Sequence, residues 1–293
     1  MREYLLSFLK EFSYEEEDVR TLTAAFDRLY ANEAAWKRFS EAVAMHRDHD
    51  VTDHNRLIPI VDEAAVLCGV HEFTADLLLY ILMSERLRER YRNLGIGEDI
   101  FYDTMCDLRY KLEECKAVKD VVGTFVPFWF TGFFDMERFA FGRLQFEQAS
   151  FDLFYRDGDK HLEPDSTVIN VHIPRDGTPL DKTRCDEAYR RAAAFFRPKI
   201  QGPLAFVCYS WLLYPELKSI LPASSNIVRF ASQYELLKWG ADAEGNDLWR
   251  LFDTDERNPD RLPQDTTARR CVAAHLKAGG RLGWGYGVFF AEE

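Results

Sequence analysis

The sequence predicts an all-helical N-terminal domain followed by a domain in which a mixed β-sheet is flanked by helices. Three observations support this fold class. Residues 1–119 repeat their apolar side chains at helical spacing and carry almost no strand signals. Residues 120–136 are rich in aromatic side chains and are interpreted as a connecting segment. In residues 137–293 strand and helix patterns alternate, which indicates an α/β or α+β domain.

The composition suits packed interiors and excludes some partners. The chain has 293 residues, more than one core usually holds, and 47% of them are apolar. A formal charge of −12 argues against general binding to nucleic acid or to an anionic membrane. The six cysteines form no Cys-x-x-Cys pair and the N-terminus lacks the apolar core of a signal peptide. We therefore expect reduced thiols and a cytoplasmic location. The oligomeric state is left open.

The N-terminal domain is expected to be a compact helical bundle. Apolar residues at helical spacing predict six helices, over residues 4–12, 15–29, 32–43, 57–67, 74–93 and 101–112. The loops between them are short, which favours a bundle of neighbouring helices.

The stretch after the third predicted helix contains the ligand types that a metal hydrolase needs. His46, His49 and His54 alternate with aspartates in this stretch. Metal ligands usually stand on ordered elements, whereas this run falls where a helix is expected to fray into a loop. We prefer a solvated loop with no bound metal, and a metal-dependent hydrolase is the minor alternative. Elemental analysis of the purified protein separates the two.

The C-terminal domain is expected to contain five main strands and several helices. The strands are predicted over residues 139–149, 167–173, 204–210, 248–252 and 283–290. Helices are predicted over 181–196, from Ser224 or Ser225 to Tyr234, and from Asp265 or Thr266 to Gly279. The glycines at 283, 285 and 287 have the spacing G-x-G-x-G with no helix after them, so they are interpreted as part of a strand.

The centre of this domain is a strand, a tight loop and a helix between residues 166 and 196. The β-branched stretch 167–173 favours an extended backbone, and Pro174 ends it. Thr178 is predicted to be the N-cap of the following helix, with Pro179 as its first residue. Free N–H groups at such a helix start attract anions. Because Asp176 and Asp181 compete for these donors, we expect weak, salt-sensitive anion binding.

Strand parity identifies candidates for chemistry. Asn170 and His172 share one face of their strand, and Arg143, Gln145 and Glu147 are predicted to share a face of theirs. If both faces lie on the same side of the sheet, Arg143, Glu147, Asn170 and His172 are predicted to project into one cavity between the two domains.

Within that cavity Glu147 or His172 can accept a proton from an attacking nucleophile, and Tyr209 or Ser210 can return one to a leaving group. The structural alternative pairs Glu147 with Arg143 and buries His172 as a satisfied core residue. Cys208 lacks an evident activating partner and is interpreted as a core residue rather than a nucleophile.

Several short motifs resemble a known family. These are Gly142–Glu147, Val171–Pro174, Cys208–Leu213 with Pro215, and Ser225–Ile227 with Phe230. With the helical domain before them, they resemble the bacterial acyltransferase-domain proteins that join an N-acyltransferase N-terminal domain to a GNAT-like C-terminal domain. The resemblance covers nearly the whole chain. It implies a GNAT-type fold and transfer of an acyl group from acetyl-CoA or another acyl-CoA to a small amine or hydroxyl acceptor, without a metal.

The resemblance also implies roles for individual residues. Its pyrophosphate loop falls on the segment after residues 167–173, which implies cofactor contacts from Arg175, Gly177, Thr178 and Asn170. Residues 204–210 take the place of the strand that splays away to admit the pantetheine arm. The candidate catalytic residues stay those chosen from the strand faces, namely Glu147, His172, Tyr209 and Ser210.

The loop departs from the family pattern R/Q-x-x-G-x-G/A. Arg175 and Gly177 are present, but the paired glycines are not, and Pro179 removes one donor N–H. A non-catalytic ligand-binding or interaction protein that keeps the fold is therefore the second hypothesis.

Overall fold

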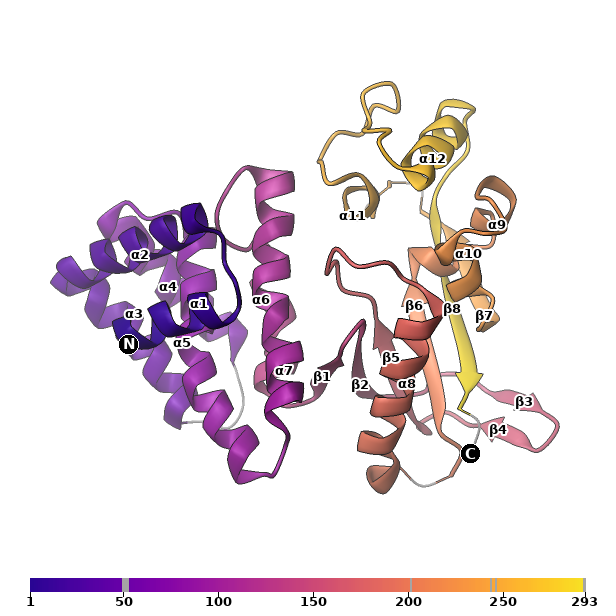
Figure 1. Cartoon of the computed structure of the whole chain (residues 1–293), viewed down its shortest axis with the longest axis horizontal. Coiled ribbons are helices and arrows are strands. Elements are labelled where there is room, and N and C mark those ends of the chain that lie inside the picture. Colours follow the sequence, from indigo (N-terminus) through magenta and orange to yellow (C-terminus); the bar gives the residue numbers. More distant parts are fainter. Residues whose placement is uncertain (49–52, 201, 243, 246, 292–293) are drawn as a thin grey trace. The chain divides into compact units, whose positions relative to one another are not determined.

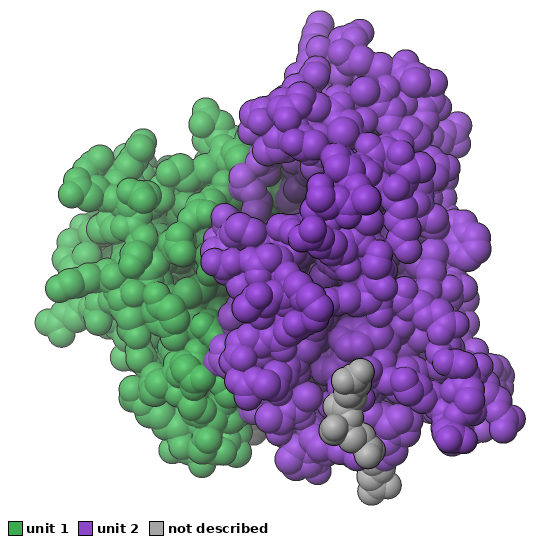
Figure 2. Space-filling view, turned by 45° about the vertical axis from the view of Figure 1, so that its right-hand side comes forward, with its two compact units in different colours: residues 1–139 green, residues 140–293 purple. Residues whose placement is uncertain are grey.

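The structure is a computed structural model that describes residues 1–48, 53–200, 202–242, 244–245 and 247–291. The chain forms two compact units, Met1–Phe139 and Ala140–Glu293, which Figure 2 shows in different colours. Each unit is described by itself below.

Unit 1 is built from helices, as the hydrophobic period predicts. Its main helices are α1 (Arg2–Glu11), α2 (Glu16–Ala31), α3 (Glu33–Asp48), α4 (His54–Cys68), α5 (Glu72–Asn93) and α6 (Glu98–Lys119). Helix α5 lies at the centre of the bundle, because every residue from Leu77 to Met83 is buried whichever side of the helix it occupies. No helix among the described residues has the length and apolarity needed to cross a membrane.

The aromatic segment 120–136 packs into unit 1. It forms a 3₁₀ helix, η1 (Pro127–Phe130), and the short helix α7 (Thr131–Phe134). The ring centroids of Phe130 and Phe134 lie 4.9 and 5.1 Å from that of Tyr80 on α5. Phe130, Phe133 and Phe134 therefore form part of the helical core, whereas Phe128 is exposed. The proposed domain limits at residues 119 and 137 stay a prediction.

His46 does not lie in a solvated loop. Helix α3 continues past it, and its side chain is buried with its ring 5.4 Å from that of Phe134. His54 begins α4, where its Nδ1 lies 3.3 Å from the hydroxyl of Tyr80 and burial lowers its pKa. His49 lies outside the described residues. The described ranges contain no group of three side chains that could hold a metal ion.

Asp76 on α5 is a buried carboxyl group that the sequence analysis did not single out. Its side chain is 3% exposed, and no described residue donates a hydrogen bond to Oδ1. Burial, with the carboxylates of Asp62 and Glu72, raises its pKa to about 8. Between about pH 4 and pH 8 the folded protein therefore holds a proton that the unfolded chain releases, so unfolding becomes easier as the pH rises.

Replacing Asp76 with asparagine is expected to remove this pH dependence. The variant gains about 3 kcal/mol of stability relative to the wild type as the pH rises from 5 to 8. Urea unfolding followed by circular dichroism at both pH values measures the difference. Asp27→Asn is the control, since Asp27 is exposed and its pKa is lowered by Arg2. An unchanged difference between wild type and Asp76→Asn at the two pH values contradicts the prediction.

Unit 2 contains a six-stranded mixed sheet, in the order β1-β2-β5-β6-β8-β7 (Figure 1). Its strands are β1 (Arg138–Phe141), β2 (Leu144–Ser150), β5 (Thr167–His172), β6 (Ala205–Ser210), β7 (Glu235–Ala241) and β8 (Gly283–Phe290). Strands β5 and β6 are parallel, whereas β2 with β5, β6 with β8 and β7 with β8 are antiparallel. Strands β3 (Tyr155–Asp157) and β4 (Lys160–Leu162) form a separate hairpin.

The two faces of the sheet have different covers. Helix α8 (Lys182–Phe196) lies across β5 and β6 in Figure 1, and its Tyr189 packs against Phe146, Phe206 and Phe289. On the opposite face, hairpin residues Tyr155 and Leu162 share an apolar cluster with Val168, Ala205, Val207 and Val288 of the sheet. The hairpin covers only part of this face of the sheet. The part beside β5 and β6 stays uncovered and carries the site described below.

The helices that follow β6 gather at one end of the sheet (Figure 1). They are η3 (Trp211–Leu213), α9 (Leu217–Ile220), α10 (Asn226–Ala231), α11 (Leu248–Phe252) and α12 (Thr267–Lys277). Residues of α9, α11 and α12 enclose a separate hydrophobic core that contains Leu217, Phe252 and Val272. We call α11, α12 and the segment between them the C-terminal lobe.

Two of the predicted strands differ from the structure. The stretch 248–252 is the helix α11, in which Leu248 and Phe252 are buried one helical turn apart and Asp253 ends the helix with a left-handed φ of 55°. The stretch 139–149 is two strands rather than one, because Gly142, with φ of 66°, turns the chain between β1 and β2.

The glycines of β8 belong to a strand, as expected. A Cβ on Gly285 would lie 2.5 Å from the carbonyl oxygen of Leu213, so glycine allows η3 to approach the sheet closely. The pairing of β8 with β7 is irregular at one point, where the register shifts between Leu236 and Lys238 of β7.

Candidate functional site

A hydrogen-bonded cluster joins β2 and β5. His172 Nε2 lies 2.7 Å from Glu147 Oε1, and the Asn170 side-chain amide donates to the same oxygen over 3.0 Å. Asn170 Nδ2 is also 3.3 Å from His172 Nε2. The side chains of Glu147 and His172 are 19% and 20% exposed, so the cluster is sheltered but reachable from solvent.

The strand register explains why these three side chains meet. In the antiparallel pair, Glu147 lies opposite Asn170, and His172 follows Asn170 on the same face of β5. The prediction that Glu147, Asn170 and His172 share a face is confirmed by their contacts. A carboxylate beside an imidazole fixes the orientation of the ring and stabilises its protonated form, which suits the histidine to accept a proton.

Arg143 does not belong to this polar face. It precedes β2, which begins at Leu144, so the predicted strand parity does not apply to it. Its Nη1 donates to the carbonyl oxygen of Pro174 over 2.9 Å, and its Nε lies 3.5 Å from Asp176 Oδ1. Arg143 therefore contacts the loop after β5, and Glu147 is held by Asn170 and His172.

Strands β5 and β6 separate next to this cluster. Their parallel pairing covers Ile169 with Phe206 and Asn170 with Val207, while β6 stays paired with β8 as far as Ser210. The expected splay of residues 204–210 away from the preceding strand therefore agrees with the register.

A cleft of about 370 Å³ opens on the same face, where β5 and β6 part. Asn170 and Tyr209 both line it, so it adjoins the Glu147–Asn170–His172 cluster. The rings of Tyr209 and Trp284 have centroids 5.0 Å apart, and Trp284 is packed so closely over Gly240 that a Cβ there would lie 3.1 Å from its ring. Asp152 and Lys238 lie at the rim, with Nζ 3.7 Å from Oδ2.

Tyr209 and Ser210 occupy different environments. The Tyr209 side chain is 58% exposed, and burial together with Asp247 and Asp242 raises its pKa, so the hydroxyl keeps its proton at neutral pH. The Ser210 hydroxyl accepts from the backbone N–H of Leu212 over 3.1 Å and caps η3. Cys208, between β-strand neighbours, is fully buried, and burial raises the pKa of its thiol, in keeping with a core residue.

Helix α8 begins later than predicted. Its N-cap is Asp181, whose carboxylate accepts from the N–H of Arg184 over 3.0 Å, and not Thr178. Asp176 causes the difference, because it accepts from both the N–H and the hydroxyl of Thr178 and holds the loop in a turn. Gly177 in that turn has φ of 75°.

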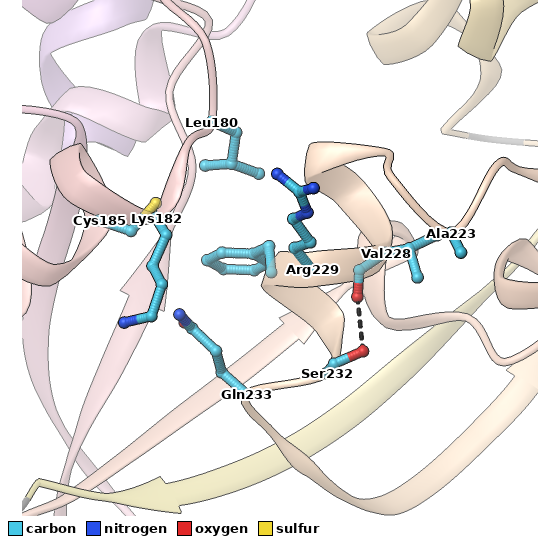
Figure 3. Close-up of a pocket in the computed structure, with 9 residues that line it drawn as sticks. Leu180, Lys182, Cys185, Ala223, Val228, Arg229, Ser232 and Gln233 are labelled. Atoms are coloured by element: carbon cyan, nitrogen blue, oxygen red, sulfur yellow. Dashed lines mark hydrogen bonds between the residues drawn. The ribbon is translucent and has the colours of Figure 1, made fainter.

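A second cavity, of about 320 Å³, lies between the start of α8 and α10 (Figure 3). Leu180, Cys185 and Phe230 form part of its apolar wall. Lys182 and Arg229 place two cationic side chains at this cavity, as Figure 3 shows. Lys182 is 2.5 Å from Asp186, whereas the guanidinium of Arg229 has no hydrogen-bond or ion-pair partner in the described part of the chain.

Sequence reasoning missed Lys182 and Arg229 as site residues. Arg229 stands inside the Ser225–Ile227 and Phe230 motif, four residues after the Ser225 N-cap of α10. The signal in the sequence for Arg229 was its place in a helix with a serine N-cap, between motif residues Ile227 and Phe230.

The fold agrees with comparisons to known proteins. Residues 139–289 match the family model of the GNAT-like C-terminal domain, and residues 3–136 match that of the N-acyltransferase N-terminal domain. The chain therefore belongs to the family of proteins that join an N-acyltransferase N-terminal domain to a GNAT-like C-terminal domain. The comparison with curated proteins gave no match.

Among solved structures the chain is similar to acyltransferases. An acyltransferase in complex with decanoyl-CoA and teicoplanin shares 23% identity at a TM-score of 0.77, over 98% of this chain and 87% of that one. An acyltransferase mutant in complex with octanoyl-CoA shares 23% identity at a TM-score of 0.78, over 99% and 88% of the two chains. At this identity the likeness establishes the fold.

Proposed function

We propose that this protein transfers an acyl group from an acyl-CoA to a small amine or hydroxyl acceptor. The observation that carries the proposal is the hydrogen-bonded Glu147–Asn170–His172 cluster beside the cleft where β5 and β6 part. The family supports the same reaction class, and the similar solved structures hold acyl-CoA molecules.

The residues present fit an acyl-CoA in two regions. The cavity between α8 and α10 offers apolar walls and the cations Lys182 and Arg229, which suit a nucleotide that carries phosphates. The loop with Arg175, Gly177 and Thr178 leads directly into that cavity. The gap between β5 and β6 then admits the pantetheine arm, with Asn170 beside it, and the acceptor occupies the cleft lined by Tyr209 and Trp284.

The proposed reaction includes two proton transfers, and a different side chain carries out each of them. When bound, the acyl-CoA supplies a thioester carbonyl that an amine or hydroxyl can attack. His172 takes the proton of the attacking group, and Glu147 stabilises the resulting imidazolium. Tyr209, whose hydroxyl is protonated at neutral pH, returns a proton to the departing thiolate. Ser210 stays a second candidate for this step.

The binding half of the proposal is tested by calorimetry with decanoyl-CoA. Arg229→Ala is expected to weaken binding about tenfold, because it removes a cation from the cavity, and the loss shrinks as salt is added. Arg156→Ala is the matched control, since Arg156 lies on the exposed hairpin strand β3. Equal affinities for wild type and Arg229→Ala place the nucleotide elsewhere.

The catalytic half is tested by measuring the release of free CoA thiol with a panel of amines and alcohols. Turnover of any acceptor supports the acyltransferase. Binding of decanoyl-CoA without turnover supports the alternative of a non-catalytic ligand-binding or interaction protein. An absence of both binding and turnover overturns the proposed function.

A further inference from the structure

Two arginines converge on one carboxylate oxygen at the loop after β5. Arg175 Nη2 donates to Asp253 Oδ2 over 2.6 Å, and Arg269 Nη2 donates to the same oxygen. The side chains of Asp253 and Arg269 are 16% and 14% exposed, whereas that of Arg175 is 40% exposed. One side of this arrangement is therefore open to a ligand from solvent.

The C-terminal lobe holds Asp253 and Arg269 in place. Asp253 ends α11, and Arg269 on α12 donates to the carbonyl oxygen of Leu251 over 2.8 Å and to Asp265 over 2.9 Å. Phe252 and Val272 of the lobe belong to a hydrophobic core that they share with Leu217 of α9. Arg175, by contrast, comes from the loop that follows β5, so this ion pair ties the lobe to that loop.

Other anion-binding groups of the same loop are also occupied by carboxylates of the chain. Asp176 accepts from the N–H and hydroxyl of Thr178, and Asp181 accepts from the N–H of Arg184. In this state the loop offers a phosphate few donors that are not already engaged. An anion that binds here must displace a carboxylate of the protein.

We propose that Asp253 is an internal competitor that occupies the position of a phosphate oxygen between Arg175 and Arg269. Two guanidinium groups that meet at one carboxylate oxygen present the forked donors that also recognise phosphate. A phosphate group carries more charge than a carboxylate, so it can replace Asp253 at Arg175. This inference rests on the proposed function, in which the phosphates belong to an acyl-CoA, and it makes the ion pair between Arg175 and the lobe depend on occupancy of the loop.

The test is calorimetric binding of inorganic pyrophosphate at low salt. Asp253→Asn is expected to bind pyrophosphate about tenfold more tightly than wild type, because the competing charge is gone. Asparagine tolerates the left-handed φ of this position, so the variant keeps the turn. The double variant Asp253→Asn with Arg175→Ala is expected to lose the gain.

The control is Asp247→Asn, which removes a carboxylate from the other end of α11, where Asp247 accepts from Arg250 Nε over 2.7 Å. It is expected to bind pyrophosphate as wild type does, which separates a local effect from a change in net charge. Equal or weaker binding by Asp253→Asn overturns the inference. A gain that survives the loss of Arg175 overturns it as well.

A parallel titration with decanoyl-CoA separates failure of this inference from failure of the proposed function. If acyl-CoA binds equally to wild type and Asp253→Asn and pyrophosphate binding is also unchanged, the inference fails and the proposed function stands. If neither protein binds acyl-CoA, the proposed function fails, whatever the result with pyrophosphate.

Discussion

Replacing His172 with alanine is expected to lower kcat for acyl transfer by a factor of about 10²–10³. The imidazole is the group proposed to accept the proton of the acceptor, and its Nε2 is held 2.7 Å from the Glu147 carboxylate. Without it, the acceptor must lose its proton to water. The measurement is steady-state release of CoA thiol at saturating acyl-CoA and acceptor.

Two further variants sharpen this result. Glu147→Gln keeps a hydrogen-bonding side chain but removes the charge, so we expect a smaller fall in kcat, about tenfold, with the KM for acyl-CoA unchanged. His161→Ala is the control, because His161 lies exposed on the hairpin strand β4. A kcat of His172→Ala equal to that of the control shows that His172 is not the proton acceptor.

Replacing Phe206 with alanine is expected to reduce the free energy of unfolding of unit 2 by about 3–5 kcal/mol. Phe206 is fully buried, and its ring centroid lies 5.2 Å from that of Tyr189 and 5.1 Å from that of Phe289. The truncation leaves a cavity between the sheet and α8, because these rings cannot all move inward. Thermal unfolding followed by circular dichroism is expected to show a midpoint lower by roughly 10 °C.

The control for this prediction is another phenylalanine of the same unit. Phe154 is 80% exposed, so Phe154→Ala is expected to change the unfolding free energy by less than about 0.5 kcal/mol. Matching midpoints for Phe206→Ala and Phe154→Ala would mean that the aromatic cluster under α8 contributes little to stability.

Much of the fold could be read from local patterns in the sequence. The helical period identified the helices of unit 1, and strand patterns identified β5, β6 and β8, because burial of one face imposes a repeat that neighbouring residues share. The same reasoning placed Asn170 and His172 on one face of their strand, and the register of β2 against β5 brings Glu147 to that face. The resemblance to the family added the expected splay between β5 and β6.

Other predictions failed where a local pattern had two readings. The stretch 248–252 has apolar residues at both strand and helix spacing, and the packing of Leu248 and Phe252 in the C-terminal lobe favours the helix. Thr178 has the chemistry of an N-cap, but its hydroxyl is engaged by Asp176, so the role passes to Asp181. His46 looked like part of a loop, although α3 continues past it into the core.

The sequence by itself therefore determined which residues form the helices and strands and which side chains share a strand face, because these features depend on spacing along a few neighbouring positions. Only the tertiary structure decided that Arg175 meets Asp253, 78 positions away, and that Lys182 and Arg229 lie at one cavity. Such contacts depend on how separate elements pack against one another. The periodicity of neighbouring residues does not determine which distant segments come into contact.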